Sequence, residues 1–389
     1  MNPLLRAEQA VLGAVLIDPG QLTRLDWLAP DHFYRPVHEA LLSALRMLRN
    51  DGHPALAADG PVPLSWVTDA VDEASLHVRG LTPSYAHTLI SACPRSEHAP
   101  VYGRMVLEGA IHRTIAQHAI RLHQAARADV VQGEVEGALG TADVLTGVLT
   151  DLARRWGIDP RPVAPTAEPT AAAAVPPLQA DQVSEDEQFL LAVLTEQPRA
   201  MDEVADWLRP EDFADPAHSQ VYRCLGALHH RGEPIDRITL LWEAQRRGLL
   251  ADGTLSGEQL TVIGDSMVPG SADWFGHRVM RSSLTRTAAA SARAIQALAD
   301  DEARGPGRLI NHALHALGPL DEVRARWATA HGGLAPKQPA SAPSAGGPPP
   351  ARVQAARARS TPRPTPSPPA GLSSVPAAAP ARSPTRGHP

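Results

Sequence analysis

The chain has few side chains in the patterns that phosphate chemistry requires. Its one lysine, Lys337, lies near the C-terminal end and is followed by Gln338. A P-loop needs lysine directly before Ser or Thr, within G-x-x-x-x-G-K-[ST], to hold the β- and γ-phosphates of a nucleotide. Neither that motif nor H-E-x-x-H, G-x-S-x-G or S-x-x-K occurs. We therefore expect no catalytic residue, no nucleotide-binding residue and no enzymatic activity.

Histidine and cysteine are the residue types that could hold a metal, and the chain has 17 and 2 of them. His112, His118 and His123 are six and five positions apart, so they do not share a helix face as ligands at i and i+4 would. Cys93 and Cys224 lie outside any C-x-x-C pair, which is typical of small buried thiols in a reducing compartment. We expect neither a metal site nor a cofactor.

Two sets of side chains could contact nucleic acid. Aromatic residues recur at matched places and could stack on bases, but their apolar helical surroundings favour core packing. Arginines along two predicted hairpins could follow a phosphate backbone, and we favour salt links to the acidic body of the chain instead. The aromatic residues are Trp27, Trp66, Trp207 and Trp242 with Phe33 and Phe213, and the arginines are Arg104, Arg113, Arg121, Arg278, Arg281 and Arg286.

The chain divides by composition into two periodic segments and two segments that cannot pack. Residues 158–183 are rich in Pro and Ala and predict a semi-stiff linker. Residues 329–389 hold no Asp or Glu but one Lys and six Arg, and we expect this tail of charge +7 to be disordered. The net charge of −6 therefore leaves −13 on the rest of the chain. An acidic body argues against broad phosphate-backbone binding there, whereas the tail could touch nucleic acid or act as a tether.

The two periodic segments, residues 1–157 and 184–328, are copies of one module. AEQAVLGAVLIDP at 7–19 matches DEQFLLAVLTEQP at 186–198, and LAPDHFYRPVH matches LRPEDFADPAH. A repeat of roughly 145 residues is too long for a solenoid and predicts two tandem domains.

Each copy is predicted to be entirely helical. Pro3 begins the first helix of copy one, whereas a capping box of Ser184 and Glu187 begins that of copy two. A short helix, a turn and a longer helix from His38 or His218 follow. No stretch shows sustained strand alternation.

The last third of each copy is predicted to be a helical hairpin with an apolar stripe. The turns fall near Asp129 in copy one and at residues 305–307 in copy two. Two helices alone bury little apolar surface, so this stripe should pack against a partner. The candidate interface residues are Ile111, Ile115, Leu122, Leu284 and Ile295.

The phrases AEQAVLGAVLIDP, LAPDHFYRPVHEAL and DGHP resemble the N-terminal domain of DnaB-type replicative DNA helicases, a family with the ordered elements E-Q-x-x-L-G-x-x-L, P-x-x-F-Y-x-x-x-H and G-x-P-I-D. Copy one is closer at the start, where it keeps Gly13 and copy two has Ala192. Copy two carries LRPEDFADPAHSQVY and GEPIDRITLLWEAQRRG, a closer match in the middle portion. The resemblance covers about 300 residues and implies an all-α domain with a globular part and a protruding hairpin. In that family the hairpins pair to build a hexamer's collar, which also receives the helicase-binding domain of primase. The RecA-like motor of the family finds no match here, so unwinding and ATP hydrolysis are not carried over.

From these features we expect a non-enzymatic, cytoplasmic interaction protein that docks with a replicative helicase or primase, or self-associates through its hairpins. No run of about 18 apolar residues occurs, so no membrane span is expected. One alternative is a helicase-related subunit that contributes to unwinding with a motor on another chain. Another is weak nucleic-acid binding through the Arg-rich tail.

Overall fold

A computed structural model of the chain describes residues 2–57, 61–165, 180–265 and 270–332. Within those ranges every regular element is helical, as the sequence predicts. The predicted disorder of the tail and of most of the linker falls outside the described residues.

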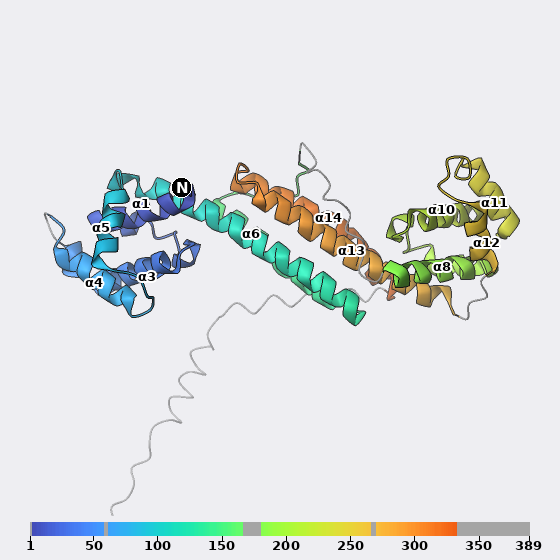
Figure 1. Cartoon of the computed structure of the whole chain (residues 1–389), viewed down its shortest axis with the longest axis horizontal. Coiled ribbons are helices and arrows are strands. Elements are labelled where there is room, and N and C mark those ends of the chain that lie inside the picture. The colour runs from blue at the N-terminus through green and yellow to red at the C-terminus, as the bar shows by residue number, and fades with distance from the viewer. Residues whose placement is uncertain (1, 58–60, 166–179, 266–269, 333–389) are drawn as a thin grey trace, which may run out of the picture. The chain divides into compact units, whose positions relative to one another are not determined.

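Copy one consists of a globular head and a hairpin of two long helices (Figure 1). The turn LAPDHF contains a 3₁₀ segment, Pro30–His32, and residues 67–71 (VTDAV) lie in a helix. The head contains α1 (Pro3–Ile17), α2 (Gln21–Arg24), α3 (Pro36–Asn50), α4 (Leu64–Ser75) and α5 (Pro83–Ala92), and the hairpin is α6 (Ala99–Gln132) and α7 (Glu136–Trp156).

Copy two repeats this order, which confirms the duplication at the level of the fold. A 3₁₀ segment, Pro210–Asp212, again precedes the longer helix of the head. The head contains α8 (Ala180–Glu196), α9 (Met201–Val204), α10 (Pro216–Arg231), α11 (Arg237–Arg246) and α12 (Gly257–Asp265), and the hairpin is α13 (Ala272–Asp300) and α14 (Pro306–Ala330).

The first helix begins at the predicted residue in copy one but not in copy two. The Asn2 side chain accepts a hydrogen bond of 2.8 Å from Leu4 N, and Pro3 opens α1 where its missing N–H costs nothing. The predicted capping box at Ser184 is wrong, because α8 already begins at Ala180. The Glu187 carboxylate instead accepts hydrogen bonds from the backbone of the turn before α10.

A buried glutamate–histidine pair explains why each copy keeps E-Q in its first helix and histidine in its third. His38 Nδ1 lies 2.6 Å from Glu8 Oε2, and both side chains are inaccessible to solvent. His218 Nδ1 lies 3.0 Å from Glu187 Oε2 in copy two. In copy one the Tyr85 hydroxyl completes the set, 2.8 Å from His38 Nε2. Buried charges need such partners, so the pair fixes the first helix of each head against the third.

Gly13 allows the close approach of α1 and α5 that distinguishes copy one. A Cβ atom at this position would lie 2.1 Å from the carbonyl oxygen of Leu89 and 2.9 Å from the Cβ of Cys93. Ala192 takes the place of Gly13 in copy two, where α12 rather than α5 packs against the first helix, α8. The glycine of the repeated phrase is therefore a packing requirement of one copy only.

Candidate interaction site at the paired hairpins

The hairpins of the two copies pack against each other within the chain. Helix α6 lies alongside α13 (Figure 1), and α7 contacts α14. The five predicted interface residues, which are Ile111, Ile115, Leu122, Leu284 and Ile295, all have zero solvent exposure. Each such side chain contributes about 1.5–3 kcal/mol on full burial. The stripe therefore has apolar partners within this chain and does not face solvent.

His112 joins the two copies by polar contacts. Its Nδ1 lies 2.9 Å from the carbonyl oxygen of Ala299, and its Nε2 lies 2.9 Å from that of Arg304. Carbonyl oxygens only accept hydrogen bonds, so each ring nitrogen of His112 lies next to an acceptor from copy two. The Ala299 carbonyl belongs to the last turn of α13, and the Arg304 carbonyl lies just before α14.

Arg324 of α14 makes a second link between the copies. Its Nη1 lies 2.6 Å from Asp143 Oδ1, and its Nη2 donates to the carbonyl oxygen of Leu139 at 2.9 Å. The chain after α7 adds a third, because Asn311 Oδ1 and its carbonyl oxygen accept from the N–H groups of Arg161 and Val163. The first residues of the predicted linker are therefore held on α14.

The turn of the first hairpin lies four residues after the position predicted from sequence. Helix α6 continues past Asp129 to Gln132 and is capped by Gly133, whose φ of 73° is unfavourable for residues with a side chain. The buried Asp129 carboxylate reaches across the turn and accepts a hydrogen bond of 2.7 Å from Ala138 N in α7. In copy two the helices are separated by residues 301–305, so the predicted break at 305–307 overlaps the connection only at Gly305, and α14 begins at Pro306.

A basic cavity of about 770 Å³ lies beside the paired helices. The one carboxylate that lines it, Asp186, is 2.8 Å from Arg278 Nη2. Arg286 donates to the carbonyl oxygens of Asp212 and Ser282, and so acts as a structural link. The arginines that line the cavity are Arg127, Arg278, Arg281, Arg286 and Arg293. This concentration of guanidinium groups in an otherwise acidic body favours an anionic ligand or partner segment.

Several of the arginines that could have formed a phosphate track hold the fold together. Arg113 donates to the carbonyl oxygens of His32 and Phe33, at 3.0 and 3.3 Å, and so ties α6 to its own head. Arg104 lies over the ring of Trp156, 4.8 Å from its centroid.

The recurring tryptophans divide into two kinds, which corrects the expectation that all four lie in the core. Trp66 has zero exposure and donates to the carbonyl oxygen of Val15 at 3.1 Å, and Trp207 is 4% exposed. Trp27 is 43% exposed and Trp242 is 61% exposed. Phe33 and Phe213 are buried as predicted. The exposed face of α11 also carries Ile238 and Leu241, so this helix presents an apolar patch to solvent.

Among the residues that the structure describes, no group of three His, Cys, Asp or Glu side chains could hold a metal ion. In the same part of the chain, the helices are too short or too polar to cross a bilayer. Burial raises the pKa of both thiols, that of Cys224 to about 11.

A model of the DnaB-like helicase N-terminal domain matches residues 1–108 and 179–266, which is half of the chain. The replicative DNA helicase DnaB of Geobacillus stearothermophilus is 32% identical over 123 residues, 31% of this chain and 25% of the relative. The replicative DNA helicase DnaC of Bacillus subtilis gives the same values. The replicative DNA helicase DnaB of Mycobacterium leprae is 42% identical over 64 residues, 16% of this chain and 11% of that protein.

The chain therefore spans about a quarter or less of the length of these curated relatives. No solved structure matches.

Proposed function

Because the chain belongs to the family of DnaB-like helicase N-terminal domains and carries that domain twice, we propose that it is a non-enzymatic interaction module of DNA replication. It would reproduce in one polypeptide the hairpin-paired unit from which a helicase collar is built. Its partners would be a replicative helicase or primase, and such a role would place it in the cytoplasm.

The observation that supports this proposal is the packing of α6 on α13. The stripe residues of both hairpins are fully buried, and His112 and Arg324 connect the copies by hydrogen bonds. The five predicted interface residues would accordingly serve pairing within the chain rather than capture of a second protein. A docking partner would meet the heads and the outer faces of an already paired unit.

The exposed apolar patch on α11 is the surface that we expect a partner to cover. Ile238 is 78% exposed and Trp242 is 61% exposed, two residue types that rarely lie together in solvent without a binding role. The residue of copy one that matches Trp242 is Trp66, which is buried. This difference supports partner contact at α11 of copy two.

Pull-down of purified host helicase and of purified primase tests the proposal. The full chain should retain at least one of them, and the double variant Ile238→Asp/Trp242→Asp should retain about tenfold less. Leu76→Asp is the matched control, since Leu76 is 76% exposed in the head of copy one. Failure of the unaltered chain to bind either protein contradicts the proposed role. Unchanged binding by the double variant contradicts the assigned surface.

A further inference from the structure

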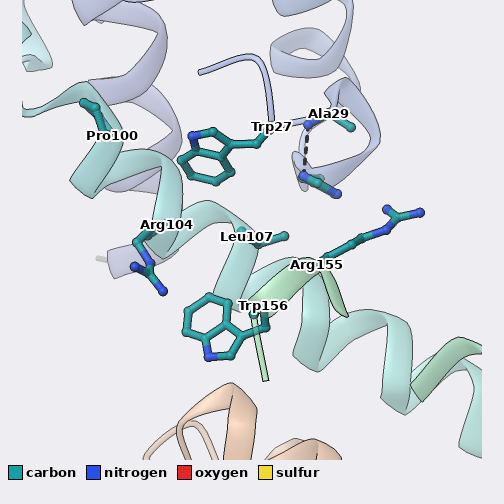
Figure 2. A pocket seen from close by; sticks show the side chains of 9 residues that line it. Trp27, Ala29, Pro100, Arg104, Leu107, Arg155 and Trp156 are labelled. Atoms are coloured by element: carbon teal, nitrogen blue, oxygen red, sulfur yellow. Dashed lines mark hydrogen bonds between the residues drawn. The ribbon is translucent and has the colours of Figure 1, made fainter. Parts of the chain in front are cut away.

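The two copies differ where each head meets the second helix of its hairpin. In copy one this place is an open pocket of about 610 Å³, shown in Figure 2. Trp27 and His32 reach it from the head, Arg104 and Leu107 from α6, and Arg155 and Trp156 from the end of α7. Its lining contains two indole rings, two guanidinium groups and no carboxylate.

In copy two the equivalent place is filled. Trp207 packs on His277 with ring centroids 5.1 Å apart, and His277 lies 6.0 Å from Trp327. Trp327 in turn lies 4.2 Å from His331. Trp207 and Trp327 correspond to Trp27 and Trp156, and His277 stands where copy one has Arg104. In copy two these aromatic side chains therefore pack against one another and fill the space that is open in copy one.

An ion pair closes copy two and is missing from its counterpart. Arg326 Nη2 lies 3.0 Å from Asp212 Oδ1, and a second contact joins Nη1 to the other carboxylate oxygen. The equivalent residues of copy one are Arg155 and His32, which cannot form this pair. Arg155 instead contacts Asp151 on its own helix at 2.7 Å and stays half exposed.

The position of His32 shows that the difference is a change of side chain and not of backbone. His32 Nδ1 accepts a hydrogen bond of 3.1 Å from Ala29 N, drawn dashed in Figure 2. Asp212 Oδ2 accepts the equivalent bond from Arg209 N at 2.7 Å. Burial lowers the pKa of His32; the nearby Asp31 opposes this effect, and Arg155 and two other arginines add to it. Copy one thus keeps the turn but leaves the guanidinium of Arg155 without a carboxylate across the pocket.

This set of groups fits a ligand that is planar at one end and anionic at the other. Indole rings stack on nucleobases, and guanidinium groups bind phosphate through paired N–H donors. A cationic ligand is disfavoured, since two arginines and no carboxylate face it. An acidic peptide would engage the arginines but leave the exposed indole of Trp27 uncovered. Pockets of about 300–1,000 Å³ are the usual size for small ligands of this kind.

We propose that the pocket of copy one binds a nucleotide, with its base against the indole of Trp27 and its phosphate at Arg155 and at Arg104, whose guanidinium group stacks on Trp156. The nucleotide is either free or one residue of a single-stranded nucleic acid, because both present the same base and phosphate. Base stacking at Trp27 and phosphate contact at Arg104 were the less favoured expectations from the sequence, which predicted no nucleotide-binding residue. A P-loop is only one way to hold a phosphate. The proposed site binds without hydrolysis and does not depend on helicase or primase association.

Titration of the full chain by calorimetry tests the site with AMP, ATP and a short oligothymidylate as probes. We expect saturable binding of at least one probe, weakened about tenfold or more in Arg155→Gln and in Trp156→Leu. Arg154→Gln is the matched control, because Arg154 directly precedes Arg155, carries the same charge, is exposed and does not line the pocket. Binding of AMP or ATP identifies a free nucleotide, whereas binding of the oligonucleotide alone identifies a single strand.

A second variant tests the comparison between the copies. His32→Asp should accept the Ala29 N–H as Asp212 accepts that of Arg209, and should pair with Arg155 as Asp212 pairs with Arg326. We expect an unchanged thermal midpoint or a higher one, and loss of nucleotide binding. The proposal is overturned if no probe binds at millimolar concentration, if Arg154→Gln weakens binding as much as Arg155→Gln, or if folded His32→Asp binds like the unaltered chain.

Discussion

The contacts that His112 and Arg324 make between the copies determine how tightly the two hairpins pair. We consider the double variant His112→Ala/Arg324→Ala. It removes two imidazole contacts to backbone carbonyls, each of about 1 kcal/mol, and a half-exposed ion pair of about 0.2–1 kcal/mol. It also removes the bond from Arg324 to the carbonyl of Leu139. Together these losses amount to about 2–4 kcal/mol.

The loss can be measured as a dissociation constant. A protease site placed within residues 166–179 allows the covalent link between the two copies to be cut without changing either hairpin. Since about 1.4 kcal/mol corresponds to a factor of ten, the double variant should raise the dissociation constant of the cleaved halves by roughly 30- to 700-fold. Size-exclusion chromatography across a dilution series, followed by calorimetry, gives this value. His87→Ala/Arg199→Ala, at two exposed positions on the heads, is the matched control.

Two results would refute this reasoning. If the cleaved halves of the unaltered chain separate at micromolar concentration, the packing of α6 on α13 is not a stable interface. If the double variant and the control shift the dissociation constant equally, the hydrogen bonds between the copies do not stabilise it.

Four further predictions concern stability and reactivity. Glu8→Ala leaves His38 and the backbone of the turn without their buried partner, so it should lower the free energy of unfolding in urea by about 3–5 kcal/mol. The control Leu76→Ala, at an exposed residue, should lower it far less. Gly13→Ala should cost at least about 2 kcal/mol, measured by thermal unfolding, whereas Ala192→Gly should cost about 1 kcal/mol; equal costs would contradict the close α1–α5 contact. Cys224, with its pKa raised by burial to about 11, should resist iodoacetamide at pH 8 until urea is added, and mass spectrometry of the labelled peptide checks this. Burial lowers the pKa of His312, so its contribution to stability is present above about pH 6.5 and is lost as pH falls through its folded pKa; between pH 7.5 and 5 the unaltered chain should lose more stability than His312→Gln.

Local sequence signals were sufficient to identify the helices of both copies. Proline at the start of α1, α3 and α10 and the apolar spacing behind it are properties of a few neighbouring residues. The same signals gave a wrong start for α8, because the Glu187 carboxylate is used by residues about 27 positions away. The Glu187 side chain could cap the start of a helix or accept hydrogen bonds from a distant turn. Tertiary contacts determine which of the two occurs, and a local sequence pattern does not contain that information.

The site was less predictable, for two physical reasons. The apolar stripe of each hairpin indicated that a partner exists, but periodicity does not say whether the partner is another protein or the second copy. The match of Trp242 to Trp66 indicated a shared core position, but exposure depends on which helix covers it. Copy one covers Trp66 completely, whereas Trp242 lies on the uncovered face of α11. The contrast between His32 and Asp212 was visible in the alignment of the copies and gained meaning only once Arg155 and Arg326 were placed beside them.

Covalent connection of the copies changes what natural variation they can tolerate. When identical domains pair as separate chains, every substitution appears on both sides of the contact at once. Here each hairpin always meets the other copy, because the covalent connection raises its effective concentration. A glycine can thus be retained at position 13 and replaced at 192, and an open pocket can persist on one side while its counterpart is closed. Joining two copies of one domain in a single chain therefore yields an asymmetric pair that always contains one of each copy.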